Sequence, residues 1–140
     1  MYTMAWGRHP ADRSGQHTLT ITTAAHADEA LDSIAAQATT DECPRMVDLY
    51  EGTWQPGQTA PATGMQLVWG HPERASLTWL GPGAGYAIDP AVPPWPQPIE
   101  YDQDEIGSHR TRLTPATVRR AVQEYLQTGQ RPTGLQWTPA

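Results

Sequence analysis

At 140 residues the chain is long enough to fold as one domain around a hydrophobic core of its own. Its formal net charge of −6, with nine basic residues, disfavours nucleic acid as a partner, because phosphate contacts depend on Lys and Arg; it favours a basic protein partner or simple solubility. The single cysteine, Cys43, excludes an intramolecular disulfide, and no apolar run suits a signal peptide or a membrane span, so we expect a cytoplasmic protein without membrane contact.

The N-terminal residues 1–15 show no clear hydrophobic period, and we expect them to form a mobile arm with Trp6 docked on the body of the protein. We expect residues 16–140 to form a single domain. Its first element is residues 17–23, in which apolar and polar side chains alternate as in a half-buried strand.

The pattern then changes to helical spacing. Residues 27–38 form one apolar stripe with the spacing of an amphipathic helix. Residues 46–51 predict a strand, and residues 52–63 contain enough Pro and Gly to predict a long loop, with Trp54 near its base.

The middle of the chain predicts a β-hairpin. Residues 65–69 and 75–79 are two strands of aromatic and aliphatic residues, and the segment 70–74 between them contains Gly and Pro. Residues 85–88 predict one more short strand.

Five prolines within residues 90–98 exclude a central strand there, because proline lacks the N–H that a sheet requires. This segment is either a rigid connector or a loop that presents Trp95. Residues 99–106 return to a strand, or a strand followed by a turn. Within it four carboxylates surround an aromatic side chain: Glu100, Tyr101, Asp102, Asp104 and Glu105.

The C-terminal part contains the clearest helix. Residues 109–113 are polar and compatible with a strand. Thr114 and Pro115 begin the helix with a capping hydroxyl and a proline at the first helical position, and Gly129 ends it. Residues 135–137 predict a last short strand.

The order of elements is strand and helix, then several strands, then helix and strand. Successive strands without regular helical crossovers predict a mainly antiparallel sheet. The expected fold is therefore a single α+β domain with two helices packed on one face of that sheet.

Motifs for metal or calcium chemistry are incomplete. His71, Pro72 and Glu73 match half of a zinc deaminase signature, but the required Cys pair should follow them and the sole Cys43 precedes them. The spacing of the carboxylates after residue 99 resembles an EF-hand loop, yet its glycine and its final glutamate are absent.

Enzyme chemistry stays open as an alternative. No two of the carboxylates stand out as a glycosidase pair, and all five histidines are distant in sequence from Cys43. A small hydrolase or transferase with a carboxylate–histidine pair is one alternative function. A structural protein-interaction domain, whose acidic run only solvates a sheet edge, is another.

The C-terminal run Thr128-Gly-Gln-Arg-Pro-Thr-Gly-Leu-Gln-Trp137 carries a family resemblance. Together with the acidic stretch Tyr101-Asp-Gln-Asp-Glu105 and the helix that begins at Thr114, it resembles immunity protein family one of bacterial polymorphic toxin systems. The resemblance covers most of the chain and leaves residues 1–15 outside.

The resemblance implies a non-enzymatic protein, with no cofactor or metal, that binds and neutralises a cognate toxin domain one to one. In this family the toxin is often a nucleic-acid deaminase. Such a toxin needs basic residues to hold phosphates, and an acidic partner can occupy the same surface. The expected toxin-binding residues are the carboxylates and nearby aromatic anchors: Glu100, Tyr101, Asp102, Asp104, Glu105, Trp54 and Trp95.

Overall fold

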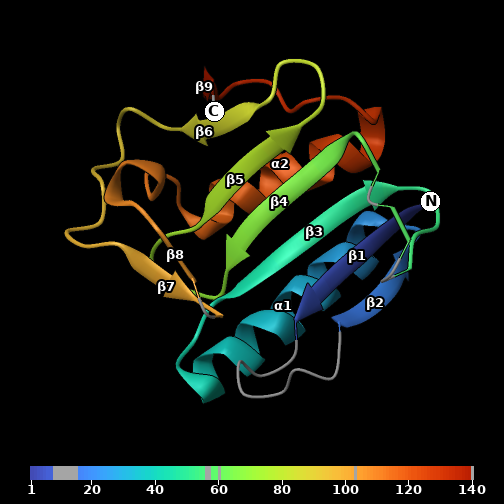
Figure 1. Ribbon diagram of the computed structural model, residues 1–140, viewed down its shortest axis with the longest axis horizontal. Helices are drawn as coiled ribbons and strands as arrows, with labels where there is room; N and C mark the ends of the chain where they lie inside the picture. Colours follow the sequence, from blue (N-terminus) through green and yellow to red (C-terminus); the bar gives the residue numbers. More distant parts are fainter. Residues whose placement is uncertain (8–15, 56–57, 60, 103, 140) are drawn as a thin grey trace.

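An antiparallel sheet forms the centre of the computed structural model, which describes residues 1–7, 16–55, 58–59, 61–102 and 104–139. Within these residues the sheet has seven strands in the order β2-β1-β3-β4-β5-β6-β9 (Figure 1). Their bounds are β1 (Tyr2–Gly7), β2 (Gln16–Ile21), β3 (Arg45–Glu51), β4 (Gly64–Trp69), β5 (Ser76–Leu80), β6 (Gly85–Ile88) and β9 (Gln136–Pro139). Each neighbouring pair is antiparallel.

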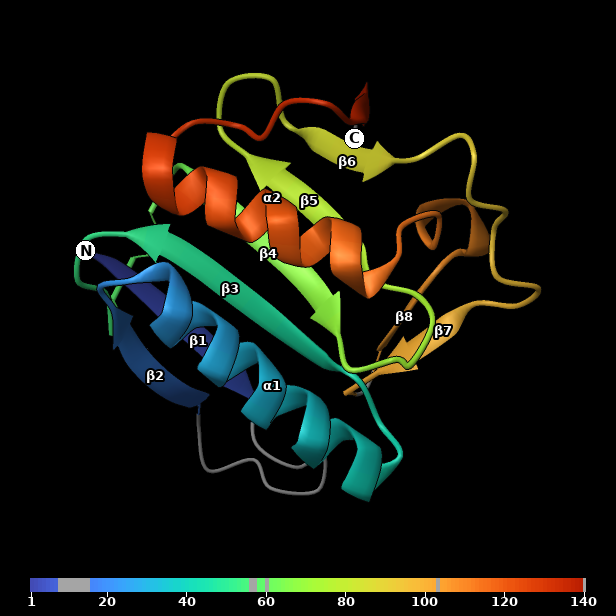
Figure 2. The ribbon, with the colours of Figure 1, turned by 180° about the vertical axis from the view of Figure 1, so that it is seen from behind.

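Both helices, α1 (Ala24–Asp41) and α2 (Pro115–Thr128), lie on the same face of this sheet (Figure 2). Local chemistry sets their ends. The hydroxyl of Thr23 accepts a hydrogen bond from the His26 amide at 3.0 Å, and Thr114 caps α2 in the same way. Gly129 ends α2 with a φ of +67°, a conformation that glycine adopts without steric cost. The predicted α+β class, with two helices on one face of an antiparallel sheet, is confirmed.

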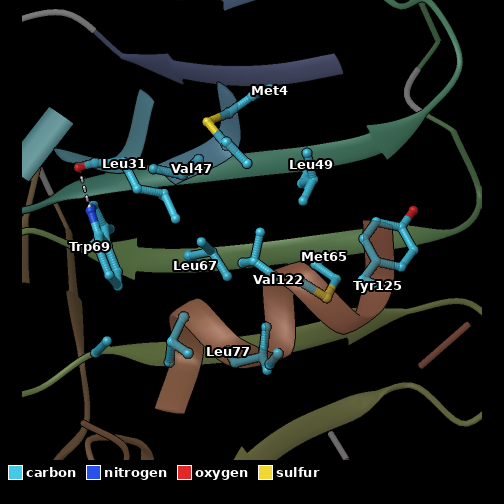
Figure 3. Packing of buried hydrophobic residues seen from close by; sticks show 14 of the residues in the cluster. Met4, Leu31, Val47, Leu49, Met65, Leu67, Trp69, Leu77, Val122 and Tyr125 are labelled. Carbon is cyan, nitrogen blue, oxygen red and sulfur yellow. Dashed lines mark hydrogen bonds between the residues drawn. The ribbon is translucent and has the colours of Figure 1, made fainter. Parts of the chain in front are cut away.

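The main core lies between the helices and the sheet (Figure 3). Strand residues alternate in direction, so every second side chain of a strand points at the helices. The Trp69 indole N–H donates to the carbonyl of Leu31 at 2.9 Å and fixes β4 against α1. Fully buried members of this core include Met4, Leu31, Val47, Leu49, Met65, Leu67, Leu77, Val122 and Tyr125. No helix in the described part of the chain has the length and apolar character needed to cross a bilayer.

The expectation of a mobile arm over residues 1–15 is wrong for Tyr2–Gly7. These residues form β1, an internal strand that pairs with β2 on one side and β3 on the other. Met4 and Ala5 are both 0 % exposed, one on each face of the sheet, so the strand is covered on both sides. Tyr2, Met4 and Trp6 alternate toward the helices with the period of a strand, but this pattern spans only six residues. Residues 8–15 lie outside the described residues.

Two predictions near the acidic stretch change in detail. Residues 99–106 form a separate hairpin of β7 (Ile99–Tyr101) and β8 (Asp104–Ile106), as a strand-plus-turn. Residues 109–113 do not form a strand. They begin in the 3₁₀ turn η1 (Ser108–Arg110), where the Thr111 hydroxyl donates to the Ser108 carbonyl at 2.7 Å. They end in a single bridge from Leu113 to Ala75, the residue before β5.

Two small clusters lie on the sheet face opposite the helices. In one, Trp54 packs on Ala5 and Tyr50. In the other, Ile99 and Ile106 of the β7–β8 hairpin pack on Val68 of β4, with Met46, Trp95 and Tyr101 beside them. This second cluster attaches the hairpin to the sheet and so determines where its carboxylates lie.

Candidate functional site

An open groove of about 490 Å³ lies beside the β7–β8 hairpin, and we call it the acidic groove. The hairpin and the loop before it form one side, the end of α1 forms another, and the β4–β5 turn contributes His71. The residues that line it are Glu42, Pro44, His71, Trp95, residues 97–100 and Glu105. The acidic groove therefore brings together three of the predicted residues, Trp95, Glu100 and Glu105.

Strand register places two carboxylates directly opposite each other. Glu100 of β7 pairs with Glu105 of β8, and the flanking pair is Ile99 with Ile106. Because side chains alternate along a strand, the isoleucines pack on the sheet and the glutamates point away from it into solvent. Like charges on opposite residues destabilise a hairpin. A bound cation would therefore relieve the repulsion between these two carboxylates.

Asp102 does not share the groove with the two glutamates. It occupies the turn of the hairpin with a φ of +47°, a left-handed conformation that Asp tolerates better than most residues. Its carboxylate accepts a hydrogen bond from the Met46 amide at 3.3 Å, and its own amide donates to the Pro44 carbonyl at 3.4 Å. Asp102 therefore fixes the hairpin to the start of β3.

Asp104 and Tyr101 form the next cross-strand pair of the hairpin. Burial, followed by the negative charge of Asp104, raises the pKa of Tyr101. The Asp104 carboxylate also accepts a hydrogen bond from the Glu105 amide at 2.8 Å. Neither residue lines the acidic groove. By strand alternation both side chains lie on the same side of the hairpin as the isoleucines, where Tyr101 packs beside them.

Trp95 is the aromatic wall of the groove, and its position is fixed from several sides. Its amide donates to the Thr111 hydroxyl at 2.7 Å. The His71 ring meets it edge-on with 4.7 Å between ring centroids, and the Arg74 guanidinium lies 5.4 Å from its ring centre. The Pro-rich segment therefore holds Trp95 at the groove and does more than connect two strands.

His71 is engaged by its own turn. Its Nδ1 atom accepts hydrogen bonds from the amides of Glu73 and Arg74, both at 3.1 Å. Burial lowers its pKa, which keeps the ring neutral and Nδ1 free to accept. In the described part of the chain, His71 makes no hydrogen bond to a carboxylate, and no group of three or more His, Cys, Asp or Glu is placed to hold a metal ion.

Trp54 lies apart from the acidic groove. It is 9 % exposed, its ring packs 5.5 Å from that of Tyr50, and its amide donates to the Thr3 hydroxyl at 3.2 Å. Burial raises the pKa of Tyr50 to about 12, consistent with a dry environment at this cluster. The structure therefore places Trp54 as a packing residue on β1 and β3, on the same sheet face as the hairpin but in a separate cluster.

Sequence comparison identifies the family. A model of the Immunity protein Imm1 family matches residues 15–139. The chain belongs to the Imm1 immunity protein family. The resemblance inferred from the C-terminal run is confirmed, and this family implies a non-enzymatic inhibitor with a cognate toxin as its partner. No curated protein and no solved structure is significantly similar to the chain.

The C-terminal run that carries the resemblance has a structural role in this Imm1 protein. The Arg131 guanidinium donates to the Gly83 carbonyl at 2.9 Å and lies 5.1 Å from the Trp137 ring centre. The Trp137 indole N–H donates to the Pro132 carbonyl at 3.0 Å. These contacts hold the C-terminal tail against the β5–β6 turn.

Two titratable residues of the acidic groove, Glu42 and His71, were not expected from the sequence to line a binding site. Glu42 adopts a left-handed conformation with a φ of +55° where α1 ends, which directs the chain from the helix into β3. His71 was considered as a metal ligand and as the histidine of a carboxylate–histidine pair, not as part of a toxin-binding surface. The turn chemistry around Cys43 and Pro44 indicates a helix end, but no local signal shows that this end lies beside the hairpin.

Proposed function

We propose that this Imm1 protein neutralises a cognate toxin domain by binding a basic surface of the toxin in the acidic groove. One observation carries the proposal: Glu42, Glu100 and Glu105 line the same groove beside an aromatic wall. Among the residues that the structure describes, none of these three carboxylates forms an ion pair. Their charges are therefore available to a partner.

The chemistry of the groove fits an arginine or lysine side chain of the partner. Carboxylates accept charge-assisted hydrogen bonds from guanidinium or ammonium groups, and an aromatic face also attracts such cations. Glu100 and Glu105 would form the ion pairs and Trp95 would be the aromatic anchor. Tyr101 and Asp104 would contact the partner near the turn of the hairpin, outside the groove lining.

The two remaining predicted residues would act indirectly. Asp102 would keep the hairpin in place through its hydrogen bond to the Met46 amide. Trp54 would support the fold through its packing on Ala5 and Tyr50. Neither would need to contact the toxin.

We propose a nucleic-acid deaminase as the toxin. An enzyme that acts on DNA or RNA holds phosphates with basic residues, and the protein's net charge of −6 complements such a surface. One copy of the protein filling the substrate groove of one toxin would block access to the active site in the cytoplasm. Protection against a lethal enzyme calls for nanomolar binding or better, about −12 kcal/mol.

Reversing one groove charge tests the proposal. Glu105→Lys should weaken binding to a catalytically inactive toxin domain by about 30-fold or more, the loss expected at an interface hot spot. The matched control is Glu29→Lys on α1, an exposed glutamate outside the acidic groove with the same change of net charge. Binding is measured by calorimetry, with survival of toxin-expressing cells as a second readout.

The control separates a local contact from a general charge effect. Equal losses for both variants would show that only net charge matters. Full affinity of the Glu105→Lys variant would show that the toxin binds elsewhere.

A further inference from the structure

A second groove continues from the acidic groove, and we call it the apolar groove. Its volume is about 280 Å³, and it shares Glu42, Pro44 and His71 with the acidic groove. Away from these shared residues, Cys43 and Pro72 contribute to a lining made mostly of apolar atoms. The two grooves thus form one continuous depression that is acidic at the hairpin and apolar at the end of α1.

Close backbone contacts fix the walls of the apolar groove. Gly70, with a φ of +115°, brings the β4–β5 turn so near to α1 that a Cβ atom there would lie 2.4 Å from the Ala38 Cβ. The Cys43 amide donates to the Ala38 carbonyl at 2.9 Å, which holds the opposite wall. A groove with fixed walls loses little conformational entropy when a partner binds.

We propose that the apolar groove receives an apolar side chain of the toxin, from the same segment whose basic side chain enters the acidic groove. This inference rests on the proposed function and adds a second determinant to it. Two observations select this occupant. The grooves share walls, so one short segment reaches both, and the unpaired carboxylates require that segment to carry a positive charge.

An apolar contact beside the ion pairs also suits a tight interface. Interfaces concentrate their binding energy in desolvated pockets surrounded by polar contacts, and exposed ion pairs alone contribute little. The acidic groove would attract and orient the basic residue, and the apolar groove would slow dissociation of the complex.

Two neighbouring threonines on α1 provide a matched test. Thr39 lines the apolar groove and Thr40 does not. Both are exposed, and each donates its hydroxyl hydrogen bond to the carbonyl four residues earlier, at 2.9 Å and 3.1 Å. Thr39→Trp should fill the groove and weaken binding of the inactive toxin domain by about 30-fold, whereas Thr40→Trp should change it less than about threefold.

A labelling experiment gives a second measurement without a substitution. Cys43 is the sole cysteine of the chain and lines the apolar groove. Saturating inactive toxin should slow alkylation of Cys43 by iodoacetamide at least tenfold.

The outcomes separate this inference from the proposed function. In one outcome, Thr39→Trp leaves the affinity for the toxin unchanged and the toxin does not slow Cys43 alkylation, while Glu105→Lys weakens binding. The apolar groove is then not a contact, and the proposed function stands. If Glu105→Lys and Thr39→Trp both leave affinity unchanged, both fail. If the free protein is a dimer that Thr39→Trp dissociates while toxin binding is unchanged, a second copy fills the groove and the inference is wrong.

Discussion

Replacing Glu100 by lysine should make the free protein more stable and at the same time weaken its binding to the toxin. Glu100 lies directly opposite Glu105 in the β7–β8 hairpin, and both side chains are exposed. Most substitutions that damage an interface leave stability unchanged or lower it. Opposite changes in the two quantities are therefore a specific signature of carboxylates held together for a partner.

The size of the effect follows from the register. Charges on directly opposite side chains lie roughly 5–6 Å apart, and in water two unit charges at that distance interact by about 0.75 kcal/mol. Glu100→Lys turns this repulsion into an attraction, and Glu100→Gln only removes it. Because both side chains are flexible and solvated, we discount the sum and expect a gain of about 0.5–1 kcal/mol for lysine and about half of that for glutamine.

Urea unfolding at low and high salt measures the gain. At low ionic strength the order of stability should be lysine, then glutamine, then glutamate at position 100. The differences should shrink at 0.5 M NaCl, because salt screens exposed charges. Hydrogen exchange of the hairpin amides reports the same change locally, in case the hairpin opens before the rest of the sheet.

The reasoning is refuted by either of two results. A Glu100→Lys variant that is less stable than the wild type would mean that the two carboxylates do not repel each other across the hairpin. A variant that is more stable and still binds the toxin with full affinity would remove Glu100 from the contact surface.

Two further predictions concern the fold. Burial raises the pKa of Asp48 above its unfolded value. The contribution of Asp48 to stability is therefore largest below pH 3.8 and is lost as the pH rises through the folded pKa. Asp48→Asn should stabilise the protein more at pH 7 than at pH 3.5, as measured by urea unfolding. Arg119 joins α2 to Asp28 and Asp32 of α1 at 3.2 Å and 2.7 Å, so Arg119→Ala should cost about 1 kcal/mol by thermal unfolding, whereas Arg120→Ala on the exposed side should change stability by less than about 0.5 kcal/mol.

The sequence alone determined the elements whose causes are local. The ends of α2 follow from Thr114, Pro115 and Gly129, each of which acts on backbone groups within a few residues of itself. The β4–β5 hairpin follows from two apolar strands around a short turn. These local signals predicted the α+β class. The run that ends at Trp137 indicated the family.

The tertiary structure decided what depends on contacts between distant residues. Strand β1 is an internal strand only because β3, more than 40 positions away, pairs with it on the side away from β2. Asp102 lies apart from the other carboxylates because it accepts a hydrogen bond from the Met46 amide, 56 positions away in sequence. Glu42 and His71 line the acidic groove with Glu100 and Glu105 only because the end of α1, the β4–β5 turn and the hairpin lie side by side. Side-chain type and spacing indicate local conformation, whereas a binding groove is created by non-local packing.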